Sequence, residues 1–157
     1  TIMFTTASGR KITYYGHEYA NEIVRIKGSN KIIKSIDELF DILLKSWCKE
    51  TAFPSCQSDY DFKNDPSYGQ CAITAVIVYD MFGGTIHKVK FSNGGTHYFN
   101  KINGHYIDLT SDQFTLYNLP VDYEHNEEVP RQYCGKNADT AKRLKLLISQ
   151  IGQNLHK

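Results

Sequence analysis

The chain has 157 residues, of which 41% are hydrophobic and 22% charged, and its formal net charge is +1. This length favours a single domain over residues 1–157, with enough buried surface to form a core without disulfides or metals. The balanced charge gives no basis for binding nucleic acid or an anionic membrane, and no apolar run reaches the about 18 residues that span a bilayer. We therefore expect neither nucleic acid nor a membrane as a partner.

The N-terminal stretch TIMFTTASGRK has no basic segment followed by an apolar one, so we expect no signal peptide and a cytoplasmic location. Three short stretches rich in β-formers follow one another over Ile2–Thr6, Lys11–Tyr15 and Glu22–Ile26. Turn residues separate them, which predicts a small antiparallel meander.

A capping box at Ser35 and Glu38 predicts a helix that continues to about Cys48. Its apolar residues recur at helical spacing, so one face is expected to pack inward. Residues 49–70 are rich in helix and strand breakers and predict a loop. Loops of this length in compact domains are usually functional, and we expect this one to form a wall of a cleft.

The run Ala72–Phe82 is apolar almost all round, which predicts a buried helix that stops at Gly83-Gly84. Strands are then predicted over Thr85–Phe91, Thr96–Ile102 and His105–Leu109. Residues 111–137 are predicted to be irregular, and Ala138–Leu155 forms a final amphipathic helix. The order of elements indicates an α+β fold.

The Asn-Gly turn at residues 103–104 is a strong hairpin signal, and it pairs Ile102 with His105. In that register His97 and Asp108 lie on the same face of the hairpin as diagonal neighbours. We expect the Asp108 carboxylate to accept a hydrogen bond from Nδ1 of His97, which leaves Nε2 facing outward.

Cys71 lies at the predicted start of the buried helix, where unpaired backbone N–H groups and the helix dipole favour a thiolate. With His97 as base and Asp108 as orienting group, it would complete a nucleophilic triad. The backbone N–H groups beside Cys71, together with Gln70, could stabilise an oxyanion.

Each of these residues also has a structural explanation. Cys71 could be a small buried hydrophobe, His97 a hydrogen-bonded core residue, and Asp108 the cap of a turn. A metal site formed by His97, His105 and Asp108 is disfavoured because His105 lies on the opposite hairpin face, so we expect no metal and no cofactor.

The four cysteines, at positions 48, 56, 71 and 134, contain no CxxC pair, so a structural zinc site of the usual spacing is not expected. A disulfide between Cys48 and Cys56 would require an oxidising compartment.

Four segments, SWCKETAFP, DPSYGQCAITAVIVYDMFGG, HYFN and IDLTSDQF, follow one another between Trp47 and Phe114. In this order they resemble the YunG-like family of small bacterial proteins, with Phe99 where that family often has tryptophan. The resemblance implies a papain-like or transglutaminase-like fold, in which a buried helix carrying the cysteine packs on an antiparallel sheet. Residues 34–157 would form this core and residues 1–33 an N-terminal β elaboration.

The resemblance also implies that Cys71, His97 and Asp108 are nucleophile, base and orienting group. The favoured hypothesis is a cysteine-dependent acyl-transfer enzyme: a peptidase, amidase, deamidase or transglutaminase-type hydrolase acting on a peptide, a protein or a small amide. We expect four further residues to contribute to oxyanion or substrate binding: Gln70, Trp47, Tyr68 and Asn100.

Two other classes remain open. In a non-catalytic binding protein, tyrosines would line a groove for a peptide or small molecule, namely Tyr60, Tyr68, Tyr98, Tyr106 and Tyr117. In an interaction or immunity protein, the N-terminal β segment would dock a partner. The sequence pattern gives neither the substrate nor the oligomeric state.

Overall fold

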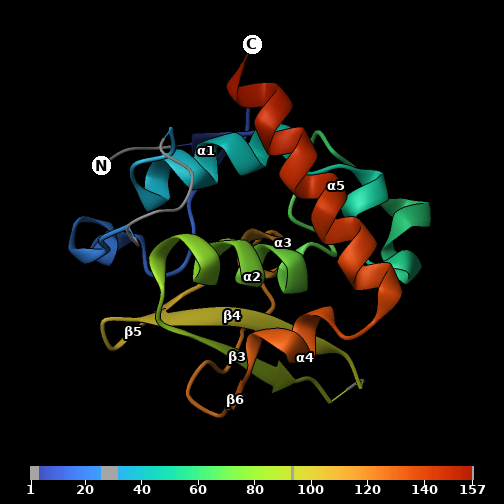
Figure 1. Ribbon diagram of the computed structural model, residues 1–157. Coiled ribbons are helices and arrows are strands. Elements are labelled where there is room, and N and C mark those ends of the chain that lie inside the picture. The colour runs from blue at the N-terminus through green and yellow to red at the C-terminus, as the bar shows by residue number, and fades with distance from the viewer. Residues whose placement is uncertain (1–3, 26–31, 93, 157) are drawn as a thin grey trace.

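The computed structural model describes residues 4–25, 32–92 and 94–156 (Figure 1). It is a mixed α+β structure in which helix α2, Cys71–Phe82, lies between a four-stranded antiparallel sheet and a layer formed by α1, Ile36–Ser46, and α5, Ala138–Leu155. The fold class and the placement of a buried helix on an antiparallel sheet are as expected. None of the helices in the described ranges is both long enough and apolar enough to span a membrane.

Helix α1 begins where the capping box predicts, since the Ser35 hydroxyl accepts the Glu38 N–H at 3.1 Å. In a capping box the Glu38 side chain would accept the N–H of Ser35, but here its carboxylate accepts the N–H of Lys34, at 2.5 Å. The helix ends at Ser46, since Trp47 already has an extended ψ of 141°. The following loop is more regular than predicted and contains two 3-10 helices, η2 (Lys49–Thr51) and η3 (Pro54–Asp59).

Helix α2 is buried on nearly every side, as its apolar composition predicts, and it ends at Phe82, since the next residue, Gly83, has a φ of 78°. The chain enters α2 through Gly69, which has a φ of 74°. A Cβ at Gly69 would lie 2.9 Å from the Cβ of Cys56, so only glycine permits both the turn and the close packing against η3. The position of Cys71 therefore depends on this glycine.

The sheet has the order β5-β4-β3-β6 and consists of β3 (Thr85–Lys90), β4 (Thr96–Ile102), β5 (His105–Ile107) and β6 (Glu127–Val129). The hairpin register is confirmed, since Ile102 pairs with His105. Strand β5 ends two residues earlier than predicted. Asp108 instead forms a bridge with Tyr15, donating its N–H to the Tyr15 carbonyl at 3.0 Å.

Residues 111–137 were predicted to be irregular, and this is wrong for three short elements: α3 (Asp112–Thr115), β6 and α4 (Arg131–Gly135). Each is at most five residues long, too short for helical or alternating periodicity to be visible. Strand β6 forms because it pairs with the edge of β3, with Val129 opposite Ile86. Its formation depends on a tertiary contact.

At the N-terminus, β1 (Phe4–Thr5) pairs with β2 (Lys11–Ile12) as an antiparallel hairpin. The third predicted strand, Glu22–Ile26, is wrong as far as it is described. Residues 17–22 form a 3-10 helix, η1 (His17–Glu22), residues 23–25 have no regular structure, and residue 26 lies outside the described ranges.

Candidate functional site

The first element of the candidate site is the N-terminus of α2, where Cys71 is partly exposed. Intrahelical hydrogen bonding begins with the Thr74 N–H, which reaches the Gln70 carbonyl at 3.1 Å. The backbone N–H groups of residues 71–73 therefore have no partner within the helix. Together with the helix dipole they make this end of α2 favourable for negative charge.

The second element is a buried pair on the neighbouring hairpin. Nε2 of His97, on β4, lies 2.6 Å from Oδ2 of Asp108, and both residues are 1% exposed. They share a face, as the register predicts, but the predicted nitrogen is wrong. Nε2 lies farther from the backbone than Nδ1 and so spans the diagonal separation better.

The Asp108 carboxylate accepts further hydrogen bonds. Oδ1 accepts the N–H and the hydroxyl of Thr110, both at 3.1 Å, and Oδ2 also accepts the Tyr123 hydroxyl at 2.6 Å. Burial and the adjacent carboxylate raise the pKa of Tyr123, so it acts as a donor. These bonds hold the carboxylate in one orientation, and the carboxylate in turn holds the imidazole.

The charge on His97 follows from these neighbours. Burial works to lower its pKa, but the charge and hydrogen bond of Asp108, with a smaller contribution from Cys71, raise that pKa to about 10. Asp108 therefore favours the protonated form of the imidazole. Its other nitrogen, Nδ1, is buried and has no hydrogen-bond partner among the described residues.

Cys71 and His97 both line a cavity of about 570 Å³. Its walls come from η3, the start of α2, the start of β4, α3, α4 and the first turns of α5. The lining combines aromatic and cationic side chains, including Phe53, Tyr98, Tyr133, Lys136 and Arg143. The cavity is therefore suited to a ligand that is partly apolar and partly polar.

The other predicted site residues lie outside the lining of this cavity. Both polar ends of the Gln70 side chain are used, since Oε1 accepts from the Thr51 hydroxyl and Nε2 donates to the Cys48 carbonyl. Trp47 is 1% exposed and donates from Nε1 to the Thr74 hydroxyl at 3.0 Å.

The remaining two have partners elsewhere. The Tyr68 hydroxyl donates to Asp59 at 3.4 Å, and Nδ2 of Asn100 donates to the Ala75 carbonyl at 2.9 Å. Asn100 thus joins β4 to α2. In this arrangement Trp47, Gln70 and Asn100 support the framework around Cys71.

Two residues near the site were missed by the sequence pattern. Tyr123 contacts Asp108, and Gln113, on α3, lines the cavity beside Cys71. Both come from the segment predicted to be irregular, where no periodicity indicates which side chains point inward. No group of three or more potential metal ligands is present within residues 4–25, 32–92 and 94–156.

A model of the family described as "YunG protein" matches residues 35–156 of this chain. The chain belongs to the YunG family. Cys71, His97, Asp108 and Gln113 all lie within the match, whereas β1, β2 and η1 precede it.

Among curated proteins, the chain is similar to "Uncharacterized protein YunG" of Bacillus subtilis (strain 168), at 38% identity over 84 residues. That alignment covers 54% of this chain and 64% of the relative. No solved structure gives a significant match.

Proposed function

We propose that this protein is a cysteine-dependent acyl-transfer enzyme with a papain-like or transglutaminase-like arrangement, acting in the cytoplasm on a peptide, protein or small amide. Cys71 is the nucleophile, His97 the proton donor and acceptor, and Asp108 the group that orients His97. The observation that carries the proposal is the buried His97 ring, which is fixed by Asp108 through Nε2 and has an unpartnered Nδ1 in the part of the chain that the structure describes.

The reaction proceeds in two steps. In the first, the Cys71 sulfur attacks the carbonyl carbon, the π electrons move to the carbonyl oxygen, and the tetrahedral intermediate collapses as His97 gives its proton to the departing nitrogen. In the second, water or an amine attacks the thioester while His97 accepts its proton, and the Cys71 thiolate leaves. The products are an amine and either a carboxylic acid or a new amide.

The charge balance of the site supports this order of events. Asp108 raises the pKa of His97 and so favours an imidazolium that begins as an acid ready to protonate the leaving group. The N-terminus of α2 provides the matching stabilisation for a thiolate. A thiolate and imidazolium held in this way would be a more reactive nucleophile than a free cysteine at the same pH.

The test is the rate at which iodoacetamide alkylates Cys71 at pH 7, followed by mass spectrometry of the Cys71 peptide. We expect Cys71 to react at least about tenfold faster than free cysteine, because the N-terminus of α2 and the neighbouring imidazole favour negative charge on its sulfur. Cys56 is an internal control, since it is also partly exposed and lines the same cavity. Alkylation of Cys71 no faster than that of Cys56 and free cysteine would refute the proposal.

The variant His97→Gln separates activation from access. It removes the imidazole while keeping a polar side chain, so the Cys71 rate should fall to that of free cysteine and the Cys56 rate should not change. An equal fall at both thiols would indicate a change in the cavity and would count against the proposed role of His97.

A further inference from the structure

In the side-chain amide of Gln113, the oxygen has a hydrogen-bond partner and the nitrogen has none among the described residues. Gln113 is 9% exposed, and its Oε1 accepts the N–H of Gly69 at 3.2 Å. Its Nε2 is buried and has no hydrogen-bond partner within the described residues. A buried donor without a partner costs about 1–3 kcal/mol, so its retention needs an explanation.

The orientation of this amide follows from its partner. A backbone N–H can only donate, so the oxygen of Gln113 must face Gly69 and the NH₂ group must face the other way. Gly69 lies two residues before Cys71, and Gln113, Gly69 and Cys71 all line the same cavity. The unpartnered NH₂ group therefore lies on the side of the amide away from Gly69, on a residue that lines the same cavity as the thiol.

The geometry points to Gln113 as the side-chain donor that stabilises the oxyanion formed when Cys71 attacks a carbonyl, and we propose it as a further catalytic residue. This rests on the proposed acyl-transfer function. Nε2 of Gln113 would act together with the backbone N–H of Cys71, which has no acceptor within α2. The carbonyl oxygen of the substrate would accept from both as it gains negative charge.

Competing donors are less suitable. Gln70 was the expected donor, but its side chain is committed to Thr51 and Cys48. Arg143 lines the cavity, yet its guanidinium already contacts Asp139 at 2.8 Å and the Thr51 carbonyl at 3.1 Å. Among the described residues of this lining, Gln113 has the buried amide whose NH₂ group is left without a partner.

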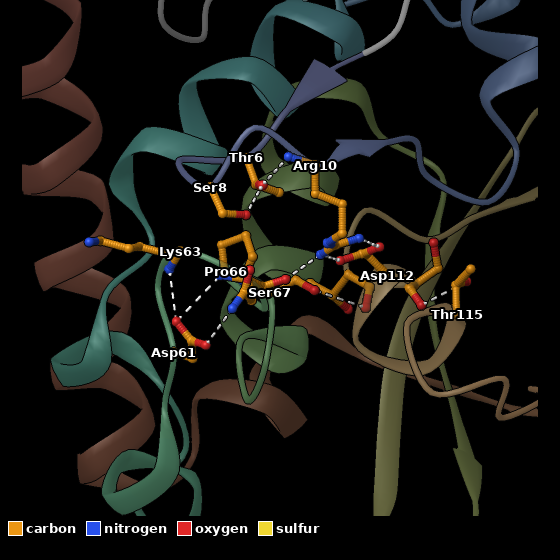
Figure 2. A network of polar contacts seen from close by, with 12 residues as sticks. Thr6, Ser8, Arg10, Asp61, Lys63, Pro66, Ser67, Asp112 and Thr115 are labelled. Atoms are coloured by element: carbon orange, nitrogen blue, oxygen red, sulfur yellow. Dashed lines mark hydrogen bonds and ion pairs between the residues drawn. The ribbon is translucent and has the colours of Figure 1, made fainter.

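The residue before Gln113 is held firmly. Both carboxylate oxygens of Asp112 accept from the Arg10 guanidinium, at 2.9 and 2.6 Å, and Figure 2 shows Arg10 reaching from the N-terminal turn to this carboxylate. Arg10 also donates to the carbonyl of Asn64, in the loop that leads to Cys71. The residue before the proposed donor and the loop that leads to the nucleophile thus share one guanidinium as a hydrogen-bond partner, which favours a preorganised site.

The test compares two reactions of Cys71. Acetylation by p-nitrophenyl acetate forms an oxyanion, whereas alkylation by iodoacetamide displaces iodide without forming one. The main variant is Gln113→Met, which keeps the size and removes the donor. We expect acetylation of Cys71 to fall about 100-fold while alkylation changes less than about threefold, so the ratio of the two rates falls.

A second variant addresses the Gly69 contact. Gln113→Glu keeps an oxygen that can accept the Gly69 N–H but lacks the NH₂ donor, and its ratio of acetylation to alkylation should also fall. Gln153→Glu, on the exposed side of α5, introduces the same charge away from the cavity and should leave the ratio unchanged.

The outcomes separate the two proposals. If Cys71 of the unmodified protein is alkylated rapidly and acetylated, but the ratio is the same in Gln113→Met, the role of Gln113 is overturned and the proposed function stands. If Cys71 of the unmodified protein is no more reactive than free cysteine, the acyl-transfer function fails and the role of Gln113 fails with it.

Discussion

The N-terminal segment, residues 4–25, contacts the segment matched by the family model, residues 35–156, at several places, which include helix α1, the loop before α2 and residues 108–112. The matched segment contributes every side chain with a proposed chemical role. The N-terminal segment contributes contacts that hold residues 108–112: Tyr15 accepts from the Asp108 N–H and donates its own N–H to the Ser111 hydroxyl at 3.0 Å.

The two segments therefore differ in what they contribute. The matched segment carries the proposed catalytic side chains, and the N-terminal segment limits how far the turn carrying Asp108 and Gln113 can move. The contact extends to side chains, since the rings of Tyr15 and Tyr123 stack with centroids 4.1 Å apart, and Tyr123 is a donor to Asp108. Substitutions in the two segments should therefore differ in their effects on the reactivity of Cys71 and on stability.

The largest effect is expected in the matched segment, from Asp108→Asn. Without the carboxylate charge, burial lowers the pKa of His97, so the ring becomes neutral at pH 7 and alkylation of Cys71 should slow at least about tenfold. Loss of one partner of a buried pair should also reduce the free energy of unfolding by about 3 kcal/mol, measured by urea denaturation.

The pH dependence of stability gives a second test of the His97–Asp108 pair. The folded pKa of His97 is raised above its unfolded value of 6.5, so its contribution to stability is complete below about pH 6.5 and is lost as the pH rises through about 10. The Asp108→Asn variant should lack this decline. Asp122→Asn is the control, because Asp122 pairs with His125 on the surface and its loss should change little. Equal effects of the two substitutions would contradict the assignment.

A smaller effect is expected in the N-terminal segment, from Arg10→Met. This variant leaves Asp112, which is 4% exposed, without its bidentate partner, and should reduce stability by about 2 kcal/mol or more. Because it loosens the turn that carries Gln113, acetylation of Cys71 should fall several-fold while alkylation stays nearly constant.

The matched control is Arg131→Met. Arg131 forms the same bidentate pair with Asp80 at 2.7 and 2.8 Å, but both side chains are exposed, so the loss should be below about 1 kcal/mol. If Arg10→Met reduced acetylation and alkylation equally, the N-terminal segment would act on the whole fold and the separation of tasks would be wrong.

Much of the fold followed from local pattern. Strand β4 and helix α5 have their predicted limits, and α2 begins one residue early, because alternation, helical spacing and the glycines after Phe82 are all local signals. The shared face of His97 and Asp108 also followed, since a two-residue turn fixes the register.

The rest depends on contacts between distant parts of the chain. Strand β6 needs β3 as a partner, and the orientation of Gln113 is set by Gly69, 44 residues earlier. The choice of Nε2 over Nδ1 on His97 depends on the shape of the space beside Asp108. No local periodicity carries this information, so these features could not be predicted from the sequence.

The smallest effect is expected at Asp65, because charged residues of both segments act on its carboxyl group. Burial and the neighbouring Asp112 raise the pKa of Asp65 to about 7, whereas Arg10 works to lower it. Its ionised form is therefore disfavoured in the folded state, and folding loses stability as the pH rises from about 4 to 7.

Asp65→Asn removes this cost. The difference in melting temperature between this variant and the unmodified protein should therefore increase by about 2 °C or more from pH 5 to pH 8, measured by calorimetry. The same increase should be larger in the Arg10→Met background, because the cation that favours the Asp65 carboxylate is then missing. A difference in melting temperature that does not vary with pH would mean that the folded structure does not disfavour the Asp65 carboxylate. Arg10 would then bind Asp112 and Asn64 without affecting the charge of the loop before Cys71.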